Sequence, residues 1–115
     1  MEIFINKIKD YSKEEQTIVI RDRGISIING NSCYEKVLSK DVKFINNVEN
    51  KLAKIMFDWK EEYVGNRKID GEKYHIVVDV NHKKKKYKIQ NKFPDNWEEF
   101  LQIKKLIMEV DKNDK

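Results

Sequence analysis

An apolar stripe in the middle of the chain constrains the fold more than any other feature of the sequence. Its members recur at intervals of three or four residues, which places them on one face of an α-helix. They are Ile45, Val48, Leu52, Ile55, Trp59 and Tyr63. Ser39 or Asp41 can cap its start, and Gly65 can follow its last turn, because glycine adopts left-handed geometry without strain. The sequence therefore predicts a helix over about residues 40–64.

Before this helix, short turns separate segments with the patterns of β-strands. Alternating isoleucines in residues 2–9 predict a first strand. Residues 17–28 are rich in β-branched side chains on both sides of an Asp-Arg-Gly turn, which predicts a hairpin. An Asn-Gly-Asn sequence at 29–31 marks another turn. Residues 32–38 fit either a fourth short strand or an approach to the helix.

After the helix, the sequence predicts a hairpin and a second helix. An Asp-Gly turn at 70–71 precedes two alternating segments, 73–80 and 85–90, with a hairpin tip near 81–84. The aromatic-proline pair at 93–94 ends the hairpin. A capping box and a helical stripe then predict a helix. Its members are Asp95 and Glu98 for the box, and Trp97, Phe100, Ile103, Leu106, Ile107 and Val110 for the apolar face.

The order of elements is therefore β-β-β-(β)-α-β-β-α, with strands in adjacent hairpins. This order predicts an α+β fold, in which two helices pack on one face of an antiparallel sheet of about five or six strands. A βαβ nucleotide-binding fold is disfavoured. The chain has 115 residues, which suits one domain over residues 1–110 and a frayed polar tail at 111–115.

Cysteine content and hydropathy bear on location. Cys33 is the one cysteine of the chain, so no intramolecular disulfide can form, as is usual in a reducing compartment. The N-terminus does not match a secretory signal, and no apolar run reaches the ~18 residues that span a bilayer. The sequence predicts a cytoplasmic protein without membrane association.

The positive charge of the chain is concentrated in one segment. Formal net charge is +4, but the stretch between Asp79 and Asp95 contains six lysines and no acid. These are Lys83, Lys84, Lys85, Lys86, Lys88 and Lys92. The rest of the chain has 18 bases against 20 acids and is slightly negative. Lysine outnumbers arginine 21 to 3, a bias typical of AT-rich genomes, so its abundance alone identifies no partner.

The lysine segment has two functional interpretations and one structural interpretation. Its charges could neutralise phosphates, with Tyr87 stacking on a base. However, arginine is absent from the segment, Tyr87 alternates with lysines and should point into the core, and no nucleic-acid-binding motif accompanies it. Alternatively, the lysines and the acidic cluster Asp58, Glu61 and Glu62 could form a dipolar surface for steered protein binding. Lysine also protects exposed sheet edges.

Other residues give weaker functional signals. The aromatic residues could form a binding hot spot, but their spacing favours a role in the core; they are Trp59, Tyr63, Tyr74, Trp97 and Phe100. His75 and Asp79 lie four residues apart, which is ~13 Å along a strand and too far to chelate one ion. Nothing in the sequence brings Cys33 near His75 or His82 as a nucleophile and base. The sequence predicts no catalytic residue, metal site or cofactor.

A set of aromatic and turn residues in the second half forms a recognisable arrangement. It consists of Trp59, Tyr63, the Asp-Gly pair at 70–71, Tyr74, Tyr87, the Phe-Pro pair at 93–94 and Trp97. Over about residues 55–107 this resembles a small group of Firmicutes proteins with the pattern W…Y…DG…[WY]…Y…[FY]P-x-x-[WF]. A glycine common in that group is Asn91 here, which also tolerates left-handed geometry. The resemblance implies an immunity or toxin-antagonist type of role and transfers no binding residues.

These observations predict a non-catalytic protein-binding module with an unknown protein partner. A nucleic-acid-binding module that uses the lysine-rich hairpin, residues 83–92, is the alternative. A small enzyme without a recognisable motif ranks third.

Overall fold

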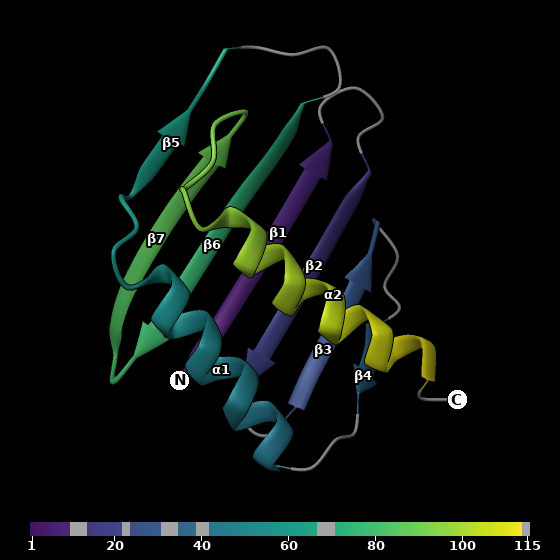
Figure 1. Cartoon of the computed structure of the whole chain (residues 1–115). Coiled ribbons are helices and arrows are strands. Elements are labelled where there is room, and N and C mark those ends of the chain that lie inside the picture. The colour runs from purple at the N-terminus through teal and green to yellow at the C-terminus, as the bar shows by residue number, and fades with distance from the viewer. Residues whose placement is uncertain (10–13, 22–23, 31–34, 39–41, 67–70, 114–115) are drawn as a thin grey trace.

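The computed structural model describes residues 1–9, 14–21, 24–30, 35–38, 42–66 and 71–113. Two helices lie across one face of a single sheet, and within these ranges the other face carries no helix (Figure 1). The helices are α1 (Val42–Met56) and α2 (Trp97–Asn113). The predicted α+β class is therefore confirmed.

Within the described residues the sheet contains seven strands, more than the five or six predicted. They are β1 (Glu2–Lys9), β2 (Glu15–Arg21), β3 (Gly24–Asn29), β4 (Glu35–Leu38), β5 (Glu62–Val64), β6 (Glu72–Val80) and β7 (Lys83–Gln90). Their spatial order is β4-β3-β2-β1-β6-β7-β5. All neighbours pair antiparallel except β5, which runs parallel to β7.

The core lies between the sheet and the helices and is built largely from isoleucine. Ile3 pairs with Ile20 and Ile5 with Ile18 across β1 and β2, and all four are at most 1% exposed. The helices bury Ile45, Val48, Leu52, Met56, Phe100 and Ile107 against this face. Full burial of one such side chain contributes ~1.5–3 kcal/mol, so this layer holds the helices on the sheet.

The predicted end of α1 is wrong. The helix stops at Met56 and not near residue 64. The Trp59 amide donates to the Met56 carbonyl at 3.1 Å, a three-residue turn that closes the helix. Trp59 stays 9% exposed beyond the helix end, and Tyr63 belongs to β5. The apolar spacing therefore continues past the helix because both aromatics still face the core layer.

Gly65 follows β5 and does not end a helix. Its amide donates to the Gln90 carbonyl at 2.8 Å, and a Cβ at this position would collide with the backbone carbonyl of Asn91. Glycine is needed here for close approach of two chains. Asn91 itself has φ 58°, so the left-handed geometry expected there is confirmed.

Three other local predictions are resolved. Residues 35–38 form β4, which pairs with β3. α2 begins at Trp97, so Asn96, and not the predicted Asp95, precedes the first turn, and its carbonyl accepts from the amides of Glu99 and Phe100 at 3.1 and 3.4 Å. α2 continues through Asn113, into the stretch predicted to be a polar tail. The proposed caps Ser39 and Asp41, Cys33 and Asp70 lie outside the described residues.

The hairpin of β6 and β7 turns at two residues. Asn81 and His82 have φ values of 52° and 67°, and Val80 pairs with Lys83. These values define a type I′ turn, whose twist matches that of the flanking strands. The tip predicted over residues 81–84 is therefore shorter, and Lys83 and Lys84 belong to β7.

The aromatic residues form a cluster between the helices and the last hairpin. Trp59 lies 5.8 Å from Tyr87 and 5.5 Å from Phe100 between ring centroids, and Trp97 lies 4.8 Å from Tyr74. Asn96 fixes this cluster to α1, because its side chain accepts from the Trp59 indole at 2.6 Å and donates to the Ile55 carbonyl at 2.8 Å. The core role that the spacing favours is confirmed for Trp59, Tyr74, Trp97 and Phe100.

Candidate functional site

The lysines at the start of β7 point from both faces of the sheet. Successive side chains on a strand alternate between faces, and Tyr87 is buried beneath the helices. Lys83 and Lys85 share the face of Tyr87, whereas Lys84 and Lys86 project from the face without helices. All four are exposed. The sequence predicts the inward position of Tyr87 correctly but places Lys83 and Lys84 in the hairpin tip, before a strand that starts at Lys85.

None of these four lysines forms an ion pair with a carboxylate of the described residues. Asp79 is the cross-strand neighbour of Lys84. Nevertheless, within the part of the chain that the structure describes, no carboxylate lies within 4.0 Å of the ammonium groups of Lys83–Lys86. The segment therefore presents uncompensated positive charge to solvent.

The outer edge of β7 is only partly covered. β5 pairs with Lys88–Gln90, and the Lys88 amide donates to the Glu61 carbonyl at 2.9 Å. No strand of the described residues lies along the earlier half of β7 (Figure 1). Because hydrogen-bonding directions alternate along a strand, the backbone groups of Lys84 and Lys86 face outward like those of Lys88. Among the described residues they have no backbone partner.

A groove of about 410 Å³ adjoins this edge on the helix-bearing face. The residues of its apolar wall are Met56, Phe57, Val78, Val80 and Tyr87, and Lys83 and Lys85 line it as well. Phe57 is 75% exposed and Val80 38% exposed. Exposed aromatic and aliphatic surface beside cationic side chains is unusual for a solvated hairpin and suits a binding groove.

Two of the three predicted acidic residues lie beside the later half of β7. Asp58 and Glu61 are exposed in the segment that joins α1 to β5, and Glu62 is the exposed first residue of β5. Glu62 is the cross-strand neighbour of Lys88, and Lys92 follows β7 as an exposed residue. The structure therefore brings Glu61 and Glu62 to Lys88, whereas Asp58 directly follows Phe57 of the groove.

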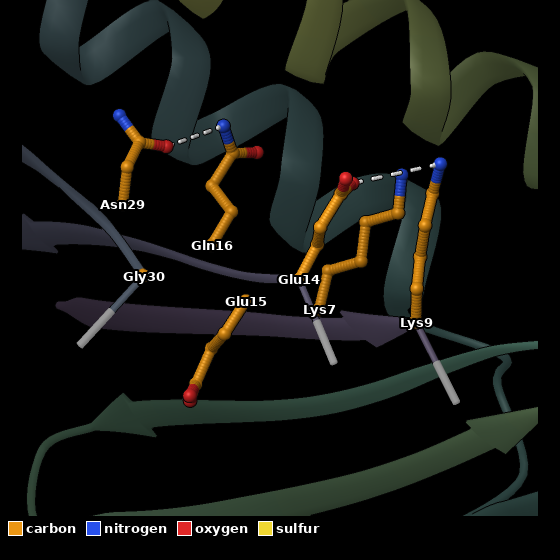
Figure 2. Close-up of a pocket in the computed structure, with 7 residues that line it drawn as sticks. All are labelled: Lys7, Lys9, Glu14, Glu15, Gln16, Asn29 and Gly30. Carbon is orange, nitrogen blue, oxygen red and sulfur yellow. Dashed lines mark hydrogen bonds and ion pairs between the residues drawn. The ribbon is translucent and has the colours of Figure 1, made fainter. Parts of the chain in front are cut away.

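A polar pocket of about 390 Å³, which the sequence did not indicate, lies at the opposite end of the sheet (Figure 2). Lys9 pairs with Glu14 at 3.8 Å, and the Gln16 amide donates to Asn29 at 3.2 Å. Glu15 points away from these side chains (Figure 2) and accepts from Asn6 at 2.8 Å. The residues that line the pocket come from β1, β2, β3 and their adjoining turns, without a regular spacing in the sequence. No sequence pattern could therefore reveal the pocket.

Beside this pocket, a cluster under α2 contains Lys7, Glu72, Tyr74 and Lys104. Lys7 pairs with Glu72 at 3.2 Å, and the Lys104 ammonium lies 5.3 Å from the Tyr74 ring centroid. Burial, with a smaller contribution from the charge of Lys7, lowers the pKa of Lys104 to about 8, against the attraction of Glu72. Burial also raises the pKa of Tyr74, and Glu72 adds to that rise. Lys7 and Glu72 are thus paired here, and burial disfavours the charged form of Lys104.

The two histidines considered for catalysis lie in different parts of the last hairpin. His75 lies on the face without helices, where burial and then the charges of Lys73 and Lys88 lower its pKa. His82 is in the β6–β7 turn, and Cys33 falls outside the described ranges. The described residues contain no group of three or more side chains suited to hold a metal ion.

Neither helix of the described chain has the length and apolar composition needed to cross a membrane. Comparison with protein-family models, with curated proteins and with solved structures gives no match.

Proposed function

We propose that this chain is a cytoplasmic bacterial protein-binding module that acts without catalysis and binds an acidic partner, as an immunity or toxin-antagonist protein would. The observation that carries the proposal is the uncompensated charge of Lys83–Lys86, displayed on both faces of β7 beside an exposed apolar groove. Complementary charge would steer an acidic partner to this part of the sheet.

The position of the lysines supports attraction of a partner over a purely solubilising role. Lysines that only keep a hairpin soluble need no apolar groove beside them. Here Phe57 leaves three quarters of its surface in water next to Lys83 and Lys85. An exposed aromatic side chain such as Phe57, with two lysines beside it, has the composition of an interface hot spot and its polar rim.

Nucleic-acid binding is the second candidate, and Phe57 is the specific observation in its favour. An exposed ring near Lys83 and Lys85 could stack on a base while the ammonium groups contact phosphates. Tyr87 cannot serve in this way, because it is 6% exposed and packs on Trp59. Phe4 and Arg21 share a hollow with Lys84 on the other face of the sheet, away from Phe57. The absence of arginine from the lysine segment itself makes this surface a poor match to single-stranded nucleic acid.

Affinity purification from the native host tests the proposal. We expect wild type to retain an acidic protein, and Lys84→Glu/Lys86→Glu to lose it, with at least about tenfold weaker binding of the purified pair. Lys43→Glu/Lys51→Glu makes the same charge change on exposed residues of α1 and should retain the partner. Recovery of RNA or DNA alone with wild type would favour the nucleic-acid candidate and reject this one.

A further inference from the structure

We propose that the uncovered edge of β7 accepts an extended acidic segment of the partner protein, which adds as a strand and places an apolar side chain in the adjoining groove. This inference rests on the proposed function and specifies its mode of recognition. It applies to the edge from Lys83 to Tyr87, which lies between the β6–β7 turn and the part of β7 that β5 covers.

The hydrogen-bonding geometry of the edge suits a strand. Lys88 and Gln90 already use their outward groups to hold the segment that contains β5, through bonds of 2.9 Å from Lys88 to Glu61 and 2.8 Å from Gly65 to Gln90. Lys84 and Lys86 continue the same outward row. A peptide backbone supplies both the donors and the acceptors that such a row requires, whereas a phosphate backbone supplies only acceptors.

The two faces beside this edge predict the sequence pattern of the ligand. A residue of the added strand that points toward the helix layer would meet the groove formed by Met56, Phe57 and Tyr87. Its neighbours would point to the other face, where Lys84 and Lys86 project. Because side chains alternate along a strand, the matching segment alternates apolar and acidic residues.

A second copy of this chain is a poor occupant of the edge. Pairing two β7 edges in an antiparallel manner would place lysines opposite lysines, and like charges directly opposite each other destabilise a sheet. The same lysines therefore oppose self-association and favour an acidic strand.

Synthetic peptides can test the pairing directly. The probe is an acetylated peptide in which Glu alternates with Val around a central Phe. One version is N-methylated at the amides that would face β7, and a matched version at the amides that would face away. We expect the first methylation to weaken binding by about tenfold and the second to leave the affinity unchanged, since only the first removes edge hydrogen bonds. Amide exchange at Lys84 and Lys86 should slow on binding of the unmodified peptide.

Substitutions in the protein test the groove. Phe57→Ala should weaken binding of the same peptide about tenfold. Val42→Ala, which alters another exposed apolar residue at the far end of α1, should not. Phe57 is 75% exposed and Val42 is 41% exposed, so neither change should unfold the protein, and thermal unfolding will verify this.

The outcomes separate the inference from the function on which it rests. Equal affinity of the two methylated peptides, with binding still lost in Lys84→Glu/Lys86→Glu, would reject strand addition and leave acidic-protein binding intact. Failure of the native acidic partner to respond to that charge reversal would reject both. Tighter binding of a single-stranded oligonucleotide than of the alternating peptide, or self-association of the free chain that Lys84→Glu/Lys86→Glu changes, would assign the edge to a different occupant.

Discussion

Lysines at the two ends of the sheet differ in whether they have carboxylate partners. Near the C-terminal end of β1, Lys7 and Lys9 lie within ion-pair distance of Glu72 and Glu14, and burial lowers the pKa of Lys104. At the β6–β7 turn, Lys83–Lys86 have no such partner among the described residues. Lysines that form ion pairs within the fold contribute to its stability. Lysines without such ion pairs are available to bind a partner. This difference predicts that substitutions at the two ends will separate stability from binding.

The largest loss of stability is expected at Asn96, which fixes the end of α1 beside the groove. Asn96→Ala removes the hydrogen bonds to the Trp59 indole and the Ile55 carbonyl, and leaves part-buried groups without partners. We expect a loss of about 2–3 kcal/mol in the free energy of unfolding, measured by urea denaturation. Asn66→Ala, at an exposed site, is the control. A loss equal to that of the control would show that Asn96 does not fix the end of α1.

The stability of the end of the sheet that contains Lys7 and Lys9 should also depend on Glu72. Glu72→Ala removes the ion pair with Lys7 and the acceptor of the Tyr74 hydroxyl, and leaves Lys7 and Lys104 facing each other. The expected loss is about 1–2 kcal/mol, since the ion pair itself is partly exposed. Glu62→Ala on the exposed β5 is the matched control. If both substitutions cost the same, the interactions of Glu72 do not stabilise this end of the sheet.

Lys104 should give this end a distinct pH dependence. Its pKa is about 8 in the folded protein against 10.5 when unperturbed, so the unfolded chain binds more protons between these values. The free energy of unfolding should therefore gain from this residue as pH rises through that window. Lys104→Met should exceed wild type in stability by about 1 kcal/mol near pH 7, with the difference shrinking toward pH 10. A difference that is constant with pH would contradict this assignment.

The smallest effect on stability is expected at the unpaired end. Lys84→Gln/Lys86→Gln should change the free energy of unfolding by no more than about 0.5 kcal/mol, because these side chains are exposed and without ion-pair partners. Partner binding should nevertheless fall, which calorimetric unfolding and a binding titration of the same sample can compare. A large loss of stability would mean that the lysines hold the hairpin together.

Periodicity predicted most of the scaffold but not its junctions. Alternation in residues 73–80 and 85–90 located β6 and β7 and the inward position of Tyr87. The end of α1 was missed because Trp59 and Tyr63 keep apolar spacing after the helix has ended. β5 has three residues, too few to show a periodic pattern. It forms by pairing with the edge of β7, a contact that the local sequence of β5 does not indicate. The division of the lysines between two faces follows from strand alternation once the turn is known to be Asn81-His82.

The central position of β1 has a consequence for the order of folding. This strand pairs on one side with β6, which lies about 70 residues later in the chain. The half of the sheet from β1 to β4 therefore keeps an open inner edge until β6 emerges. Pairings this distant in sequence close slowly, so the nascent chain should be most prone to aggregation between synthesis of α1 and synthesis of β6.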